Sequence, residues 1–158
     1  MLAYDFAALA GALRGFTVQS SVTWQDAEIE DAVDPANEGN EVPYAWEEKA
    51  AWSLQYETEE LWRIALGGVY VGDSFSDEAN TAVENANGNL GINSSRTIWD
   101  AQLSHDTDWG QKARVRFSVG VTNLFDDEWS VHSRGGFFGG GKVAGPPQQL
   151  YVGLQVNL

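Results

Sequence analysis

The 158-residue chain contains no cysteine, which excludes disulfides, thiolate metal sites and cysteine nucleophiles. No apolar run approaches the roughly 20 residues that a membrane-spanning helix requires. Lys and Arg number only 9 against 23 Asp and Glu, a net charge of −14. This balance argues against nucleic acid as a partner, because phosphate contacts require a basic surface. The amino-terminal stretch 1–14 has no basic segment before its apolar residues, so we identify no signal peptide.

Motifs for catalysis or cofactor binding are also lacking. The two histidines, His105 and His132, lie 27 positions apart and show no metal-ligand spacing. The glycine-rich stretch 135–141 lacks the Lys-Ser/Thr pair of a phosphate loop, so we interpret it as a flexible loop. The sequence therefore predicts that the chain is not an enzyme and binds no cofactor or resident metal.

The last nine residues show what the chain does contain, because apolar and polar or small residues alternate up to its end. Successive side chains of a strand point to opposite faces, so this alternation predicts a strand with one apolar face. Six earlier segments show the same pattern, at about 3–12, 16–25, 50–57, 62–70, 97–104 and 113–122. Seven strands of this length are close to the roughly 9–11 residues that a transmembrane β-strand requires.

The connections between these segments alternate in length without exception. Short connections are expected at 13–15, 58–60 and 106–111, and long ones at 26–48, 73–95 and 125–148. Tight turns at one end and extended loops at the other are typical of an outer-membrane barrel. The polar face would line the interior of such a barrel, and it carries Arg63, Arg114 and Arg116 together with Gln19, Gln25, Gln55 and Gln102.

Nearly the whole chain resembles one family of such barrels, and the most specific motifs lie near its carboxy terminus. Asn123, Leu124, Phe125 and Asp126, followed by Trp129, resemble the penultimate-strand motif of TonB-dependent outer-membrane receptors. The upstream stretches 23–29 and 42–45 resemble receptors of the siderophore type, and 69–73, 77–81 and 99–100 resemble the ferric-chelate subgroup. Gly145 and Pro147 resemble the turn that precedes the closing strand of that family. The closing strand itself would contain Leu150, Tyr151, Val152, Leu154, Val156 and Leu158. Two departures are Gln148, where the family has Arg, and Leu158, where it has Phe.

The resemblance implies that residues 1–158 are the carboxy-terminal part of a 22-stranded antiparallel barrel whose plug and earlier strands are absent from this sequence. It implies a receptor in the outer membrane of a Gram-negative bacterium that takes up a ferric siderophore or similar chelate. The expected partners are that ligand, outer-membrane lipid, the TonB complex through the missing amino-terminal region, and the barrel-insertion machinery through the closing strand. An open seven-stranded sheet also leaves two unpaired edges, which lipid does not tolerate.

Two alternatives remain at this point, a small autonomous eight-stranded outer-membrane protein with a structural or adhesive role, and a soluble ligand-binding β-barrel. The expected long loops hold most of the acidic residues, including a cluster of five: Glu28, Glu30, Asp31, Asp34 and Glu38. Such carboxylates are able to coordinate a hard cation, but no EF-hand spacing is present, so a solvated acidic loop is favoured. An acidic entrance would favour cationic or neutral chelates over anionic ones.

Overall fold

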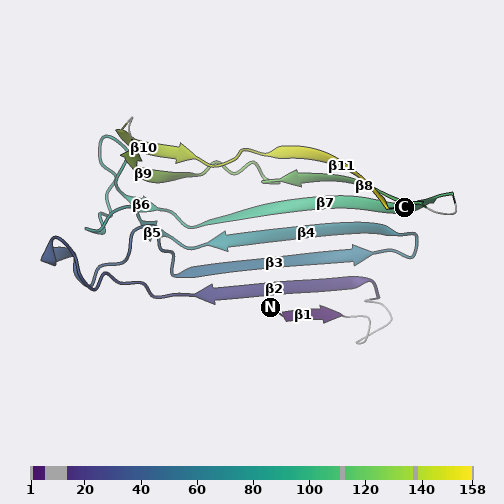
Figure 1. Ribbon diagram of the computed structural model, residues 1–158, viewed down its shortest axis with the longest axis horizontal. Coiled ribbons are helices and arrows are strands. Elements are labelled where there is room, and N and C mark those ends of the chain that lie inside the picture. Colours follow the sequence, from purple (N-terminus) through teal and green to yellow (C-terminus); the bar gives the residue numbers. More distant parts are fainter. Residues whose placement is uncertain (1, 6–13, 111–112, 137–138, 158) are drawn as a thin grey trace.

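The computed structural model describes residues 2–5, 14–110, 113–136 and 139–157. Its main element is one curved layer of antiparallel strands, shown in Figure 1. The strands of this sheet are β1 (Leu2–Asp5), β2 (Phe16–Trp24), β3 (Glu48–Glu57), β4 (Trp62–Val71), β7 (Arg96–Trp109), β8 (Ala113–Thr122) and β11 (Gln149–Asn157). They are hydrogen bonded in the order β1-β2-β3-β4-β7-β8-β11, so each strand pairs with its neighbours in the chain once the small loop strands are set aside. The predicted all-β, antiparallel fold is confirmed.

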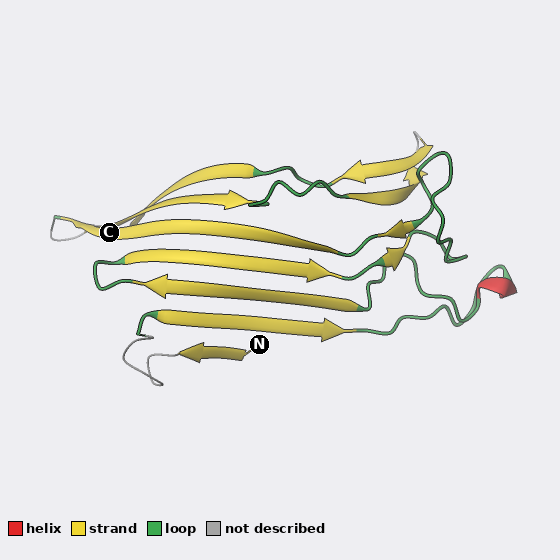
Figure 2. Ribbon diagram, turned by 180° about the vertical axis from the view of Figure 1, so that it is seen from behind, coloured by secondary structure: helices red, strands yellow, loops and turns green. Residues whose placement is uncertain are grey.

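The smaller elements all belong to the long connections. β5 (Ser74–Phe75) pairs with β6 (Ile92–Asn93), and β9 (Ser130–Gly136) pairs with β10 (Gly139–Ala144). A 3-10 turn, η3 (Pro35–Asn37), is capped by Asp34, whose side chain accepts the N–H of Ala36. Figure 2 shows these elements at one end of the sheet and the short turns at the other. No helix in the described ranges is long and apolar enough to cross a membrane.

From β2 onward, the alternation of short and long connections holds in the structure. β3 and β4 are joined by residues 58–61 and β7 and β8 by residues 110–112, whereas segments 25–47, 72–95 and 123–148 make the long connections. We call the side of the sheet where these three segments gather the long-loop end, and the opposite side the short-turn end. Most of the connection from β1 to β2 lies outside the described residues.

Strand register places the apolar residues of different strands on one face. Directly opposed residues of antiparallel strands lie on the same side of a sheet. One continuous row across six strands is Val18, Leu54, Leu66, Ala101, Val121 and Leu150. The neighbouring row on the other side is Thr17, Gln55, Ala65, Gln102, Gly120 and Tyr151. The two faces predicted from alternation are therefore the two faces of the sheet, which we call the apolar face and the polar face.

The apolar face has no second layer packed against it. Val152 of β11 remains 80% exposed, Leu154 65% and Ile64 of β4 53%. Within the described ranges Val115 is the one hydrophobic residue that is buried. A ten-residue strand such as β3 is about 33 Å long, enough to cross the apolar band of an outer-membrane barrel at a tilt. The face thus has the polarity and height of a surface that meets lipid.

One predicted boundary is wrong, and another lies mostly outside the described residues. Residues 106–111 were expected to be a turn, but β7 continues to Trp109, which pairs with Ala113. The polar run of 104–108 resembles a turn in sequence, yet Asp106 and Asp108 lie opposite Arg116 and Arg114 and extend the sheet. At the amino terminus the segment expected at 3–12 is described only as β1, and residues 6–13 lie outside the described ranges.

The glycine-rich stretch also differs from expectation. Residues 135–141 were interpreted as a flexible loop, but the structure places 135–136 in β9 and 139–141 in β10. The two strands pair from Ser130 opposite Ala144 to Gly136 opposite Gly139, with an irregularity between Gly139 and Gly141. Residues 137 and 138 lie outside the described ranges. Strand pairing needs only backbone groups, which glycine also has, so hydropathy gave no indication of it.

Candidate functional site: the polar face and the long-loop end

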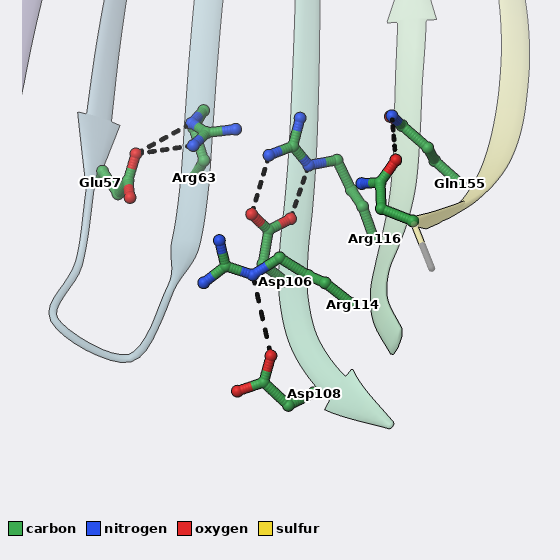
Figure 3. A network of polar contacts seen from close by, with 8 residues as sticks. Glu57, Arg63, Asp106, Asp108, Arg114, Arg116 and Gln155 are labelled. Atoms are coloured by element: carbon green, nitrogen blue, oxygen red, sulfur yellow. Dashed lines mark hydrogen bonds and ion pairs between the residues drawn. The ribbon is translucent and has the colours of Figure 1, made fainter. Parts of the chain in front are cut away.

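Three ion pairs line the polar face near the short-turn end, as Figure 3 shows. The pair with the most regular geometry joins β7 to β8, where Arg116 donates from Nε to Asp106 Oδ1 at 2.5 Å and from Nη2 to Oδ2 at 2.8 Å. This two-pronged contact matches the planar guanidinium to the planar carboxylate and is stronger than a single bond. Asp106 is only 8% exposed, so its charge depends on this partner.

The other two pairs are looser. Arg63 donates from Nε and Nη2 to a single oxygen of Glu57, at 3.1 and 2.7 Å. Arg114 lies 3.8 Å from Asp108, and both side chains are more than half exposed. The sequence predicted the three arginines on this face, and the register confirms them there. The partners Asp106 and Asp108 were not predicted, because their segment was interpreted as a turn. The sequence does contain a signal for them: the acids at 106 and 108 and the arginines at 114 and 116 have the same i, i+2 spacing, as expected for two paired strands.

The predicted glutamines divide into two groups. Gln19, Gln55 and Gln102 lie on the polar face of β2, β3 and β7. Gln25 lies one residue beyond β2 and donates its side-chain amide to the carbonyl oxygen of Trp46 at 2.7 Å. Gln25 therefore helps to hold the first long connection against the end of β2 instead of lining the sheet.

Small side chains occupy the middle of the polar face. A shallow pocket of about 220 Å³ lies there, and its lining includes Gln19, Ser53, Gly67 and Asp100, which form one row across four strands. Short side chains such as Ser53 and the glycine at 67 leave space for the pocket on this part of the polar face. The longer arginine side chains near the short-turn end extend away from the sheet.

At the long-loop end, the first two long connections are hydrogen bonded to each other. Asn80 accepts the N–H of Glu41 at 2.8 Å and donates to its carbonyl oxygen at 3.0 Å, so one side chain replaces a pair of backbone bonds. Asn40 donates to the carbonyl oxygen of Glu78 at 2.8 Å. Segments 25–47 and 72–95 are therefore joined through these residues.

The second and third long connections are joined through His132 of β9, which is 6% exposed. Its backbone N–H donates to Asn93 Oδ1 at 2.6 Å, and its Nδ1 donates to the carbonyl oxygen of Gly88 at 2.8 Å. Lys142 of β10 adds an ion pair with Glu84 at 2.6 Å. His132 thus joins two loops, and all three long connections form one hydrogen-bonded assembly.

His105 lies far from His132, on the apolar face near the short-turn end. It is opposite Trp62 of β4, and the two rings stack with centroids 4.4 Å apart. Its buried Nδ1 has no hydrogen-bond partner among the described residues. An amphipathic ring pair at a strand end is typical of the aromatic girdles that border the apolar band of a membrane barrel.

At the long-loop end, neighbouring acidic residues affect the pKa of Glu41. The pKa of Glu41 is raised above its ordinary value, first by partial burial and then by the negative charges of Glu47, Asp73 and Asp26. In the described part of the chain, no group of three or more His, Asp or Glu side chains is arranged to hold a metal ion. The cluster Glu28, Glu30, Asp31, Asp34 and Glu38 lies along segment 25–47, and all five residues are exposed.

The segment that resembles the receptor motif connects the end of β8 to the start of β11. Asn123 is 3% exposed with a φ of 50°, a left-handed conformation that Asn tolerates better than most residues. Its side-chain amide donates to the carbonyl oxygens of Asp127 and Pro146 at 3.0 and 3.2 Å, and its Oδ1 accepts the N–H of Asp127 at 3.0 Å. Its backbone N–H donates to Asp100 of β7.

Asp126 and Gln148 make the second half of the same connection. The N–H of Gln148 donates to Asp126 Oδ1 at 2.9 Å, and the side chain of Gln148 donates to the carbonyl oxygen of Leu124 at 2.8 Å. Gln148 therefore bonds to both ends of the segment 124–126. Phe125 is 65% exposed, and its ring lies nearly perpendicular to that of Trp99, with the centroids 6.5 Å apart.

Gly145 lies directly against the ring of Trp129. A β-carbon at this position would be 1.9 Å from Cε2 of that ring, so only glycine fits without displacing the tryptophan. The guanidinium of Arg96 also approaches this ring system, 4.3 Å from the ring centroid. Pro147 follows in an exposed position before β11. In β11 the apolar residues Leu150, Val152, Leu154 and Val156 are all at least half exposed, Tyr151 lies on the polar face over Gly120, and Leu158 is outside the described residues.

Comparison with solved structures decides which barrels this sheet resembles. No protein-family model matches the chain. The ferric citrate transporter FecA in its unliganded form is 28% identical and superposes over 98% of the chain with a TM-score of 0.89. The predicted resemblance to TonB-dependent receptors is confirmed.

Two more distant receptors share the fold. The ferric preacinetobactin receptor BauA from Acinetobacter baumannii is 16% identical over 90% of the chain, with a TM-score of 0.67. The ferric-catecholate import receptor Fiu from K12 E. coli is 21% identical over 90%, with a TM-score of 0.62. All three solved proteins are transporters or receptors by name. The chain spans only 18–23% of their lengths.

Proposed function

We propose that the chain is the carboxy-terminal part of a 22-stranded outer-membrane receptor of a Gram-negative bacterium that takes up a ferric siderophore or similar iron chelate. The observation that carries this proposal is the continuous apolar face, because such a surface is stable against lipid and unstable in water. The similarity to the ferric citrate transporter over 98% of the chain supports the choice of receptor and ligand class.

In this proposal the two ends of the sheet have different tasks. The long-loop end faces the outside and contributes to the entrance for the chelate, while the short-turn end faces the periplasm. The polar face lines the interior around a plug domain, and the TonB complex supplies energy through the plug. Uptake then follows from a difference in affinity between the open and closed arrangements of loops and plug.

The closing strand and the motif take structural tasks in the same proposal. Leu150, Val152, Leu154 and Val156 present the apolar side of the last strand to lipid and to the insertion machinery. The free edge of β11 pairs with the first strand of the barrel, because unpaired backbone groups in lipid cost several kcal/mol each. Asn123, Asp126 and Gly145 fix the direction in which the chain enters this strand.

Uptake of radiolabelled iron tests the proposed function. Deleting the gene for the intact protein is expected to lower uptake of at least one chelate from a panel containing ferric citrate and ferric catecholates. For that chelate, loss of TonB should lower uptake in the wild type but should not lower the uptake that remains in the deletion strain. Unchanged uptake of every chelate in the panel would contradict the proposal. Refolding of residues 1–158 alone into a heat-modifiable barrel in detergent would instead support an autonomous small barrel.

A further inference from the structure

A pocket of about 260 Å³ lies on the polar face near the short-turn end. Arg63 of β4 and Arg116 of β8 both line it, and Figure 3 shows their guanidiniums pointing toward one another across β7. The rest of the lining is polar or small except for one leucine: Gln102, Ser104, Ser118, Gly153, Gln155 and Leu154. Among the described residues that line the pocket, none carries a negative charge.

The two guanidiniums are held in position from outside the pocket. Glu57 accepts two donors of Arg63, and Asp106 accepts two donors of Arg116. A guanidinium has five N–H donors, so these contacts use two of the five in each residue. The ion pairs fix both planar groups before any ligand arrives, which lowers the entropy that binding would otherwise cost.

Neutral donors lie beside the two cations. Ser104 and Ser118 are directly opposed on β7 and β8, and Ser104 is 5% exposed. Their hydroxyls, with the side-chain amide of Gln102, add hydrogen-bond donors to the pocket. Two like charges that face each other repel, and an anion between them removes that repulsion. Because Glu57 and Asp106 already balance the two arginines, a singly charged anion suits the pocket better than a multiply charged one.

We propose that this pocket binds a carboxylate between Arg63 and Arg116. The planar guanidinium donates two parallel bonds to a carboxylate, which fits both the shape and the charge of the site. The carboxylate comes either from a protein segment that fills the interior of the barrel or from a small free carboxylic acid, and the chemistry of recognition is the same. The inference rests on the proposed barrel, whose interior wall carries the pocket, but not on which chelate is transported.

Ligand-observed NMR with acetate, on the intact protein that contains this chain in detergent, tests the site. The double variant Arg63→Lys/Arg116→Lys keeps both positive charges opposite Glu57 and Asp106 but loses the planar fork. It is expected to bind acetate at least tenfold more weakly than the wild type. Arg114→Lys is the matched control, because Arg114 lies on the same face two residues from Arg116 and does not line the pocket. Its acetate binding should be unchanged.

A second variant covers the case in which the double variant fails to fold, as judged by heat-modifiable mobility. Ser104→Val removes a donor and fills part of the pocket without touching either ion pair, so it must also weaken acetate binding. If a protein carboxylate already occupies the pocket, the wild type shows no acetate binding. The double variant and Ser104→Val then increase amide exchange of the segment inside the barrel, while Arg114→Lys does not. The proposal is overturned when neither acetate binding nor amide exchange distinguishes these variants from Arg114→Lys.

Discussion

The strand sheet and the long-loop end differ in which side chains they expose and which they bury. The sheet presents apolar side chains outward, with Val152 and Leu150 more than two thirds exposed. The long-loop end buries polar side chains instead, and those below 7% exposure are Ser76, Asp77, Asn93, Asn123 and His132. Buried polar groups are stable only when they are hydrogen bonded, and the contacts of Asn93, Asn123 and His132 meet that condition. The sheet thus depends on apolar surroundings, while the loops depend on specific internal bonds.

Replacing an apolar-face residue by arginine is the largest change we expect. Leu54→Arg places a charge near the middle of β3 and should lower the free energy of unfolding from a lipid bilayer by about 2–4 kcal/mol. Denaturant titration of the intact protein in lipid vesicles measures this. Gln55→Arg is the control, because the adjacent residue points to the polar face and should change stability much less. Equal losses of unfolding free energy in both variants would show that lipid does not contact the apolar face in preference to the polar face.

Asn123 provides the next test, at the junction between sheet and loops. Asn123→Ala removes three side-chain hydrogen bonds and leaves a left-handed backbone without its usual support. We expect a loss of about 2–3 kcal/mol in the same titration, since buried partners are left unpaired. Asn123→Asp keeps the bond from the N–H of Asp127 but loses both donated bonds, so its loss should be intermediate. If Asn123→Ala left the free energy of unfolding unchanged, the pairing of β8 with β11 would be sufficient to hold this junction.

Asn93 tests the loop assembly away from the sheet. Asn93→Ala removes the acceptor of the His132 N–H and should lower local stability by about 1–2 kcal/mol. Hydrogen exchange is expected to rise in segments 72–95 and 130–144 while amides in β3 and β4 keep their protection. Asn87→Ala serves as the control, because Asn87 belongs to the same connection and is exposed. Faster exchange throughout the sheet would show that loops and sheet are one cooperative unit.

The Glu84–Lys142 pair gives the smallest effect and depends on pH. The hydrogen bond from Lys142 is the main cause that lowers the pKa of Glu84 below its ordinary value of 4.5. A carboxylate with a lowered pKa stabilises the folded loops above pH 4.5, and this contribution is lost as the pH falls through the lowered pKa. NMR titration of the Glu84 carboxyl should show the low pKa, and Lys142→Met should raise it toward 4.5. A Glu84 titration that is the same in both proteins would exclude the ion pair in solution.

The sequence predicts the sheet better than the loops for a physical reason. The alternation at 113–122 and 150–158 has the period of a strand, so the face of each side chain can be assigned without knowing its partner. The end of β7 could not be assigned in this way, because Asp106 and Asp108 belong to a strand only in the presence of Arg116 and Arg114. The candidate site was therefore half predicted, with its arginines but without its acids.

By itself, the sequence determined the two faces, the alternation of short turns and long connections, and the receptor-like ending. These features depend on local period and composition, which each strand carries within about ten residues. Only the tertiary structure decided how the long connections bind one another, since His132 meets Asn93 from 39 residues away and Gly88 from 44. It also decided that Asn123 bonds to Pro146 across 23 residues and that Arg63 and Arg116 face one pocket. Contacts between residues far apart in the chain follow from strand register and loop packing, and no local pattern contains them.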